Sequence, residues 1–241
     1  AGKRDAFPRG TAKHNGSHFF LIRQSMKHDE AIRFAEEHGG HLAIAPTPED
    51  KQFLVKSLPL KSPVWVGAGI AAYEKWQWMD ASAWDASDQV STTSVDDRHA
   101  LLTPQGALVA ANGKQENEFI IQWRNNGTNP CSLEAQLKRT TASIEKSGID
   151  QARYPVGTRT FQKSHFLLIP KSLSWENTYQ FAKAHKANLP VPSSAAEQAW
   201  LLKHYSGKAI TVWLGGYLLD QKSPWRWTTK ERFVAIGWKP G

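Results

Sequence analysis

The feature that most constrains the fold of this chain is an internal repeat. The block Ser17–Ile22 (SHFFLI) returns in the second half as Ser164–Ile169 (SHFLLI). Five further blocks return in the same order and at a nearly constant separation: Phe34-Ala35 with Phe181-Ala182, His41-Leu42 with Asn188-Leu189, Phe53-Leu54 with Trp200-Leu201, Val64–Gly67 with Val212–Gly215, and Trp76–Trp78 with Trp225–Trp227. Matches in one order and at one separation indicate a duplicated unit. The chain is therefore predicted to contain two copies of one domain.

Each copy is predicted to run strand, helix, strand, helix and then several further strands. The opening aromatic and apolar block is typical of a half-buried strand. Ser25 and Ser174 stand where the N-caps of the first helix are expected, and Gly39-Gly40 is expected to end that helix in the first copy. A second helix is predicted to begin at Thr47–Asp50, and its counterpart at Ser194–Glu197, because each pairs a hydroxyl N-cap with a carboxylate three residues later.

The repeat gives the 241-residue chain a predicted domain order. Residues 1–10 form a tail, 11–125 a first domain, 126–156 a helical linker and 157–241 a second domain. Within the linker a short helix is expected near residues 130–146, since Leu133 and Leu137 lie four residues apart. No closing strands are recognisable in the second copy, so we expect a downstream segment or a partner chain to complete its sheet.

The repeated blocks resemble the C-type-lectin-like domain family. The motifs that carry the resemblance in the first copy are Gly39–Ala43, Val64–Gly67, Trp76–Trp78 and the closing strand Glu118–Trp123. The resemblance covers roughly residues 14–125 and 157–241. It implies an α+β fold of two tandem C-type-lectin-like domains, each with two helices packed on small antiparallel sheets, joined by the helical linker.

The chain departs from the family in its cysteines. Ala35, Ala182 and Ile121 stand where the family's half-cystines are expected, and Cys131 is the only cysteine. A lone cysteine excludes an intrachain disulfide and a cysteine-based metal site, and we interpret Cys131 as a small linker residue. The resemblance together with the missing disulfides indicates a disulfide-free, bacterial version of the fold.

The calcium site of the family's sugar-binding members has no recognisable counterpart. That site needs carboxylate and amide oxygens around the cation, supplied in the family by a proline-containing triplet and a Trp-Asn-Asp-like strand. After Trp78 the first copy reads Met79–Asp85 without such a triplet, and Leu108–Ala110 offers no side-chain oxygen. The sequence therefore predicts calcium-independent binding, with no metal and no cofactor.

Composition narrows the classes of partner and the compartment. The formal net charge is +8, and most of the basic excess lies after residue 130, but no nucleic-acid-binding motif accompanies it. No apolar run approaches the roughly 20 residues that a membrane-spanning helix needs. We expect a secreted, periplasmic or cell-surface protein, although the sequence leaves the cytoplasm open.

The candidate binding residues lie in a polar insert of the first copy, Asp80–His99. In the related fold this region holds most ligand sites, and loops carry function in general. The candidates are Trp84, Asp85, Asp96, Arg98 and His99. The alternative is a solvated loop whose tryptophan only plugs the edge of the domain.

Three functions are compatible with these features. The leading hypothesis is a non-catalytic module that recognises a protein or carbohydrate ligand. The second is a structural module of a larger extracellular or envelope assembly. The third, weaker hypothesis is catalysis of the kind found in the distantly related formylglycine-generating enzymes. Those enzymes rely on metal-binding or redox cysteines, whereas this chain has Cys131 alone, and no catalytic residue is identified.

Overall fold

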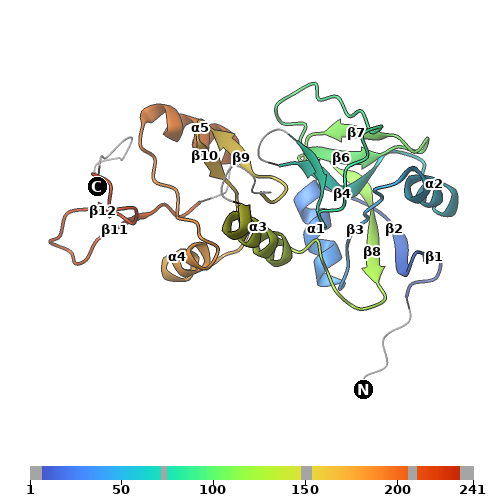
Figure 1. The fold of residues 1–241 in the computed structure, drawn as a ribbon, viewed down its shortest axis with the longest axis horizontal. Helices are drawn as coiled ribbons and strands as arrows, with labels where there is room; N and C mark the ends of the chain where they lie inside the picture. Colours follow the sequence, from blue (N-terminus) through green and yellow to red (C-terminus); the bar gives the residue numbers. More distant parts are fainter. Residues whose placement is uncertain (1–6, 72–74, 148–153, 206–210, 234–241) are drawn as a thin grey trace, which may run out of the picture. The chain divides into compact units, whose positions relative to one another are not determined.

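The structure is a computed structural model that describes residues 7–71, 75–147, 154–205 and 211–233. The chain divides into two compact units, unit 1 (Ala1–Thr158) and unit 2 (Arg159–Gly241). Figure 1 shows the helices and strands of both units. The chain is α+β, as the sequence predicted, because helices and mainly antiparallel strands occur in both units.

Unit 1 is built on one sheet of eight strands with three helices. The strand order is β1-β2-β8-β4-β6-β7, with β3 paired to β8 and β5 paired to β4. The strands are β1 Ala12–His14, β2 Ser17–Met26, β3 His41–Leu42, β4 Val64–Ile70, β5 Trp76–Trp78, β6 His99–Leu102, β7 Leu108–Ala111 and β8 Asn117–Arg124. The helices are α1 His28–Glu37, α2 Pro48–Ser57 and α3 Leu133–Ser147.

Strands β4 and β8 form the centre of unit 1. β8 is antiparallel to β2, with Leu21 opposite Ile120, and parallel to β4, with Trp65 opposite Phe119. All seven residues of β4 are buried, as expected for a strand that is covered on both faces. The largest fully buried side chains of the unit include Trp65, Trp78 and Phe119. The core therefore forms around strands that are distant in sequence.

The helix starts test the predicted caps. Thr47 caps α2 as predicted: its hydroxyl accepts a hydrogen bond from the Asp50 amide at 3.1 Å, with Pro48 as the first helical residue. Ser174 likewise caps α4 in unit 2. The predicted cap at Ser25 is wrong, because β2 keeps the chain extended through Met26 and α1 begins after Lys27.

The helix expected near residues 130–146 is α3, and it packs within unit 1. The Gln136 side chain donates to the Cys131 carbonyl at 2.8 Å and accepts from the Val156 amide at 3.1 Å. Arg139 donates to the carbonyl of Met79 at 2.5 Å. Cys131 is buried in the main apolar cluster, so its interpretation as a small linker residue understated its role.

Unit 2 contains two helices and two short hairpin sheets. Its elements are β9 Arg159–Phe161, β10 Ser164–Phe166, α4 Trp175–Ala184, α5 Ala195–Tyr205, β11 Gly216–Tyr217 and β12 Arg226–Trp227. The β9–β10 hairpin pairs Phe161 with Ser164, the repeat positions of His14 and Ser17, which pair in the β1–β2 hairpin. These hairpins share a left-handed turn residue as well, with φ of 43° at Asn15 and 53° at Gln162.

The repeat pairs Val212–Gly215 with Val64–Gly67 and so implies a strand there, but the described residues of unit 2 form strand β11 at Gly216–Tyr217 instead. In unit 1 the matching residues belong to β4, which pairs with β5, β6 and β8. In unit 2 the Gly215 amide donates to the Pro190 carbonyl at 2.9 Å, and the Gly215 carbonyl accepts from the Thr228 amide at 2.8 Å. A strand is defined by its partners, so the sequence pattern alone does not produce one here.

Candidate ligand-recognition surface

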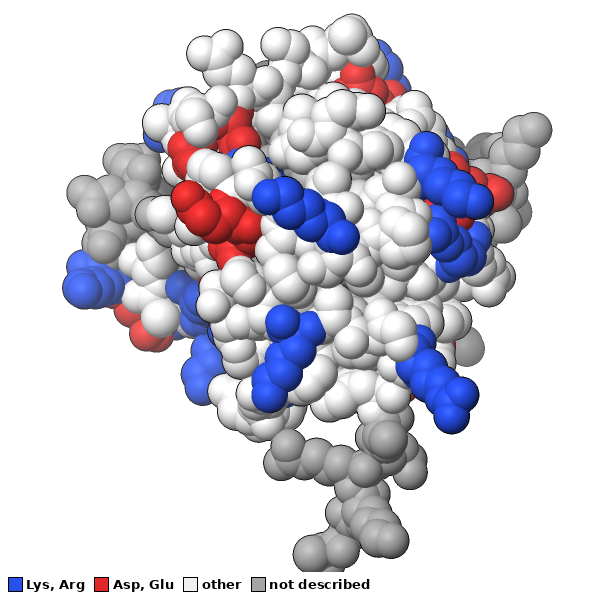
Figure 2. Space-filling model, turned by 90° about the vertical axis from the view of Figure 1, so that its right-hand side faces the viewer, with Lys and Arg blue, Asp and Glu red and all other residues white. Residues whose placement is uncertain are grey.

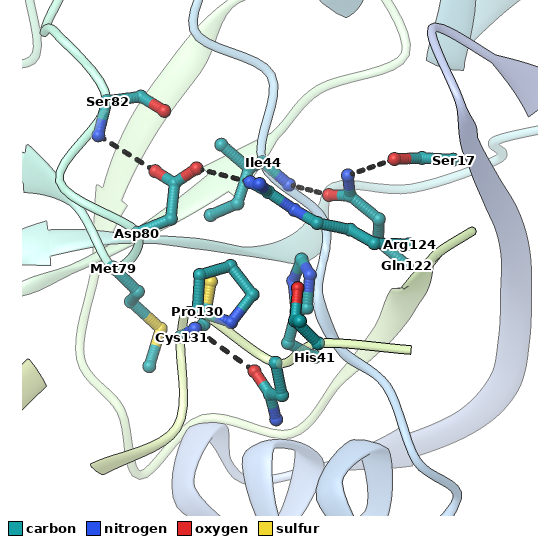
Figure 3. Close-up of polar contacts among 12 residues, drawn as sticks. Ser17, His41, Ile44, Met79, Asp80, Ser82, Gln122, Arg124, Pro130 and Cys131 are labelled. Atoms are coloured by element: carbon teal, nitrogen blue, oxygen red, sulfur yellow. Dashed lines mark hydrogen bonds and ion pairs between the residues drawn. The ribbon is translucent and has the colours of Figure 1, made fainter. Parts of the chain in front are cut away.

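The insert (Asp80–His99) connects β5 to β6 in unit 1, and its first residue is fixed by a partly buried ion pair. The Asp80 carboxylate lies 2.7 Å from an Arg124 guanidinium nitrogen and also accepts the Ser82 amide at 2.9 Å. Figure 3 shows this pair between the start of the insert and the end of β8. Asp80 thereby anchors the insert to the central strand.

A second set of buried polar contacts lies beside this pair (Figure 3). The Gln122 side-chain carbonyl accepts from the Ile44 amide at 2.8 Å, and its amide group donates to the Ser17 hydroxyl at 3.0 Å. Asn129 accepts from the Cys131 amide at 3.0 Å. Burial raises the pKa of the Cys131 thiol well above its usual range, with nearby Asp80 adding to the shift. The thiol therefore stays protonated within the core and is a poor nucleophile or metal ligand.

Trp84 closes the edge of the core beneath the insert. Its ring centroid lies 5.7 Å from those of Trp76 and Trp78. Its indole nitrogen donates to the Asp88 carbonyl at 3.3 Å, and the residue is half-buried. This geometry matches the plugging role that the sequence left as the alternative for this tryptophan.

The carboxylates in the middle of the insert have local partners. Asp85 accepts from the Ser87 amide at 2.8 Å and from the Ser87 hydroxyl at 2.7 Å, and these hydrogen bonds lower the pKa of Asp85. Asp88 forms an ion pair with Lys51, whose side chain is buried on α2. Each carboxylate thus stabilises a turn or an attachment of the insert.

Asp97 organises the far end of the insert. Its carboxylate accepts from the Thr93 hydroxyl at 2.8 Å and from the amides of Thr93 and Ser94 at 3.2 and 2.9 Å. Asp96, half-buried, makes backbone contacts in the same turn: its amide donates to the Ser94 hydroxyl and its carbonyl accepts from Arg98. The carboxylate of Asp97 was not among the predicted site residues, although it fixes the shape of this turn.

Arg98 and His99 lie below the insert rather than on its surface. The buried Arg98 guanidinium donates to the carbonyls of Thr158 and Ala71 at 2.9 and 3.1 Å. The His99 ring stacks on His28, with centroids 3.8 Å apart. Burial, and secondarily the neighbouring His99, holds the pKa of His28 well below its usual value. These side chains position the insert from inside unit 1.

The outer side of the insert carries a rim of small side chains, Thr92–Val95. Together with Ile70, these residues line a shallow depression. Val95 is 70% exposed, which is the largest exposure among the large apolar side chains of unit 1. The sequence analysis found the insert but missed this rim. The only sign of the rim in the sequence is an uncharged run of short side chains next to Asp96-Asp97.

Metal-ligating groups and charged side chains are the remaining surface features. Within the described ranges, no group of three or more His, Cys, Asp or Glu side chains could hold a metal ion. Figure 2 shows one face of the molecule, on which acidic side chains lie at the left, the top and the right and basic side chains are distributed among them. Among the described residues, no helix has both the length and the apolar character to span a bilayer.

Comparisons with known proteins identify the class of the fold. No model of a known protein family matches the chain. The secretory phospholipase A2 receptor of Bos taurus is 29% identical over 69 residues, which is 29% of this chain and 5% of the receptor. C-type lectin domain family 10 member A of Rattus norvegicus is 29% identical over 86 residues, 36% of this chain and 27% of that protein. The matched stretches therefore span only a small part of these curated relatives.

The chain is also similar to solved structures. The C-type lectin domain of murine dendritic cell inhibitory receptor 2, solved in complex with an N-glycan, is 15% identical and has a TM-score of 0.45. The alignment covers 49% of this chain and 99% of that domain. The motifs of unit 1 follow one another in the expected order, and the curated relatives point to the same class. The chain therefore contains a C-type-lectin-like fold.

Proposed function

We propose that this chain is a non-catalytic recognition module whose unit 1 binds a glycan or a protein, without calcium, through the outer side of the insert. The observation that carries the proposal is how the insert uses its carboxylates. Asp80, Asp85, Asp88 and Asp97 all accept hydrogen bonds or pair with cations inside unit 1. A calcium cage needs six to eight oxygen ligands, whereas at least one oxygen of each of these carboxylates already holds the loop in shape.

The residues of the insert fall into two roles in this proposal. Trp84, Arg98 and His99 act as positioning residues, because their contacts lie under the insert. Asp85 and Asp96 are proposed to contact the ligand together with the rim Thr92–Val95. A preformed loop loses little conformational entropy on binding, which favours affinity.

The relatives support recognition rather than catalysis. The bovine relative is named as a receptor and the rat relative as a C-type lectin. A formylglycine-type enzyme would need reactive cysteines, and the buried, protonated Cys131 does not favour that alternative. A secreted, periplasmic or cell-surface location and a bacterial source remain part of the proposal, since both came from the resemblance and the missing disulfides.

A glycan array tests this proposal when it is combined with a matched pair of variants. The array is run in calcium and again in excess chelator. Val95→Asp places a charge on the most exposed residue of the rim, whereas Val109→Asp places one on an exposed position of β7, outside the insert. We expect Val95→Asp to weaken binding at least tenfold while Val109→Asp leaves it nearly unchanged. Equal losses in the two variants would contradict recognition by the insert.

If the array is negative, the same pair is tested against immobilised candidate proteins from the source organism. Binding that is sensitive to Val95→Asp alone would then assign the insert to protein recognition. Equal binding of a ligand to all variants would mean that its binding site lies outside the insert. A structural role in an assembly is the second candidate, and it is favoured by apolar side chains that unit 2 exposes.

A further inference from the structure

The turn that opens the insert of unit 1 recurs in unit 2. The Ala81 amide donates to the Trp78 carbonyl at 3.0 Å, and the Lys230 amide donates to the Trp227 carbonyl at the same distance. Both turns hold a residue in the left-handed region, with φ of 66° at Ala81 and 65° at Lys230. Unit 2 therefore follows the path of unit 1 beyond the last block that the two sequences share.

The aromatic plug of the insert recurs together with this turn. Trp84 lies six residues after Trp78, and their ring centroids are 5.7 Å apart. Phe233 lies six residues after Trp227, and the centroids of this pair are 4.7 Å apart. Phe233 is thus the counterpart of Trp84, although sequence identity does not mark it.

The charges around the turn differ between the two units. At the positions of Gln77 and Ala81 in unit 1, unit 2 has Arg226 and Lys230. Both basic residues are exposed. Positions that are uncharged in unit 1 are therefore cationic in unit 2.

These residues border an open hollow of about 350 Å³ on unit 2. Sites for small molecules span roughly 300–1,000 Å³, so the hollow is large enough for one or two sugar rings. Trp225, which is 40% exposed, forms part of its wall. The lining includes Tyr217, Trp225, Arg226, Lys230, Glu231 and Phe233.

The side chains of the hollow offer three kinds of contact. The exposed indole of Trp225 presents a flat apolar face to the C–H groups of a sugar ring. The cations of Arg226 and Lys230 favour sulfate or carboxylate oxygens through charge-assisted hydrogen bonds. The Glu231 carboxylate accepts hydrogen bonds from hydroxyl groups and repels a ligand that has anionic groups alone. The lining therefore fits a ring that carries both hydroxyl and anionic groups.

We propose that unit 2 binds an anionic saccharide, with sulfate or uronic-acid groups, in this hollow. The sugar ring stacks on Trp225, its anionic group pairs with Arg226 and Lys230, and its hydroxyl groups donate to Glu231. The inference does not rest on the function proposed for the insert of unit 1, so either proposal can fail without the other.

The test measures binding to the full chain by isothermal titration calorimetry. The salt concentration is about 0.15 M, which screens charges that lie more than about 8 Å apart. The probes are sulfated disaccharides from chondroitin and heparin, and lactose is the neutral control. We expect saturable binding of a sulfated disaccharide. Lactose should bind at least tenfold more weakly, because it has no anionic group for the two cations.

A matched pair of lysine variants locates the site. Lys230→Gln removes a cation of the hollow, whereas Lys222→Gln removes one from the loop between β11 and β12, outside the lining. Loss of a charge-assisted hydrogen bond should weaken binding at least tenfold in Lys230→Gln. Lys222→Gln should bind nearly as tightly as the unchanged chain.

A second pair of variants tests the stacking contact. Trp225→Ala should weaken binding, and Trp225→Phe should restore most of it, since a phenyl ring keeps a flat apolar face. Circular dichroism shows whether each variant still folds. If Trp225→Ala unfolds unit 2, the lysine pair still decides the question.

Three results would overturn the proposal. The first is no binding of any sulfated disaccharide. The second is an equal loss in the two lysine variants, which would mean that dispersed positive charge attracts the probe. The third is equally tight binding of a poly-aspartate peptide that Lys230→Gln weakens in the same way, which would assign the hollow to an acidic protein segment.

Discussion

At the scale of single residues, the clearest chemical consequence concerns His28. Its ring is buried between Trp65 and His99, and burial is the main cause that lowers its pKa below the ordinary value of 6.5, with His99 second. The folded chain therefore keeps His28 neutral at a pH where the unfolded chain protonates it. Because the unfolded state then binds more protons, folding stability rises with pH through this range.

The expected pH dependence follows from that direction. The contribution of a neutral His28 is complete above about pH 6.5 and is lost progressively as the pH falls below that value. We predict a lower urea midpoint at pH 5 than at pH 7.5, and a smaller difference for His28→Gln. His38→Gln, at the exposed end of α1, serves as control. An unchanged pH dependence in His28→Gln would rule out this residue as the cause.

The residue scale also shows where sequence reasoning about the site was limited. Trp84 and Val95 belong to the same irregular insert, yet Trp84 packs inward on Trp76 while Val95 points outward. Helices and strands have a period that separates inner from outer faces, but an irregular loop has none. The sequence therefore located the insert without separating its positioning residues from its rim.

At the scale of elements, unit 1 depends on contacts between distant segments. The Asp80–Arg124 pair joins the insert to β8, and Asp80 is almost fully buried while Arg124 is about one-third exposed. Removing the carboxylate leaves a cation that water can partly solvate, which reduces the penalty relative to a fully buried pair.

We therefore predict that Asp80→Asn destabilises the chain by about 1–3 kcal/mol. Asp85→Asn serves as its matched control, because the Asp85 carboxylate accepts its hydrogen bonds from Ser87, two residues away in the same turn. The control should leave the urea midpoint of unit 1 nearly unchanged. A comparable loss in both variants would mean that the buried pair does not anchor the insert.

Elements also show how much of the fold the sequence could predict. The caps at Thr47 and Ser174 were predictable because they depend on residues three apart. The absence of a strand at Val212–Gly215 could not be predicted from the sequence. A strand needs partner strands, and a local sequence pattern does not say whether they are present. The cap at Ser25 failed for a related reason, since pairing with β8 keeps β2 extended through Met26.

At the scale of the whole molecule, the two units differ in the apolar core that they enclose. Unit 1 buries most of the apolar side chains, whereas Leu189 and Trp227 are the buried hydrophobic residues among those described in unit 2. Because burial of apolar surface is the main stabilising contribution to folding, the units should differ in stability.

We predict that amide hydrogen exchange is fastest in α4 and α5 and slowest in β2, β4 and β8. Local opening needs less free energy where few apolar contacts are broken. Equal protection of the two units in the free chain would contradict the difference in their cores.

The most direct measurement of the central claim is the affinity of unit 1's ligand, taken from the array, for the full chain in calcium and in excess chelator. The account predicts the same Kd within about twofold, since the carboxylates of the insert are already engaged by Arg124, Ser87, Lys51 and the Thr93–Ser94 turn. Binding that disappears in chelator and returns with calcium would show that these carboxylates leave their internal partners to hold a cation, and it would contradict the account.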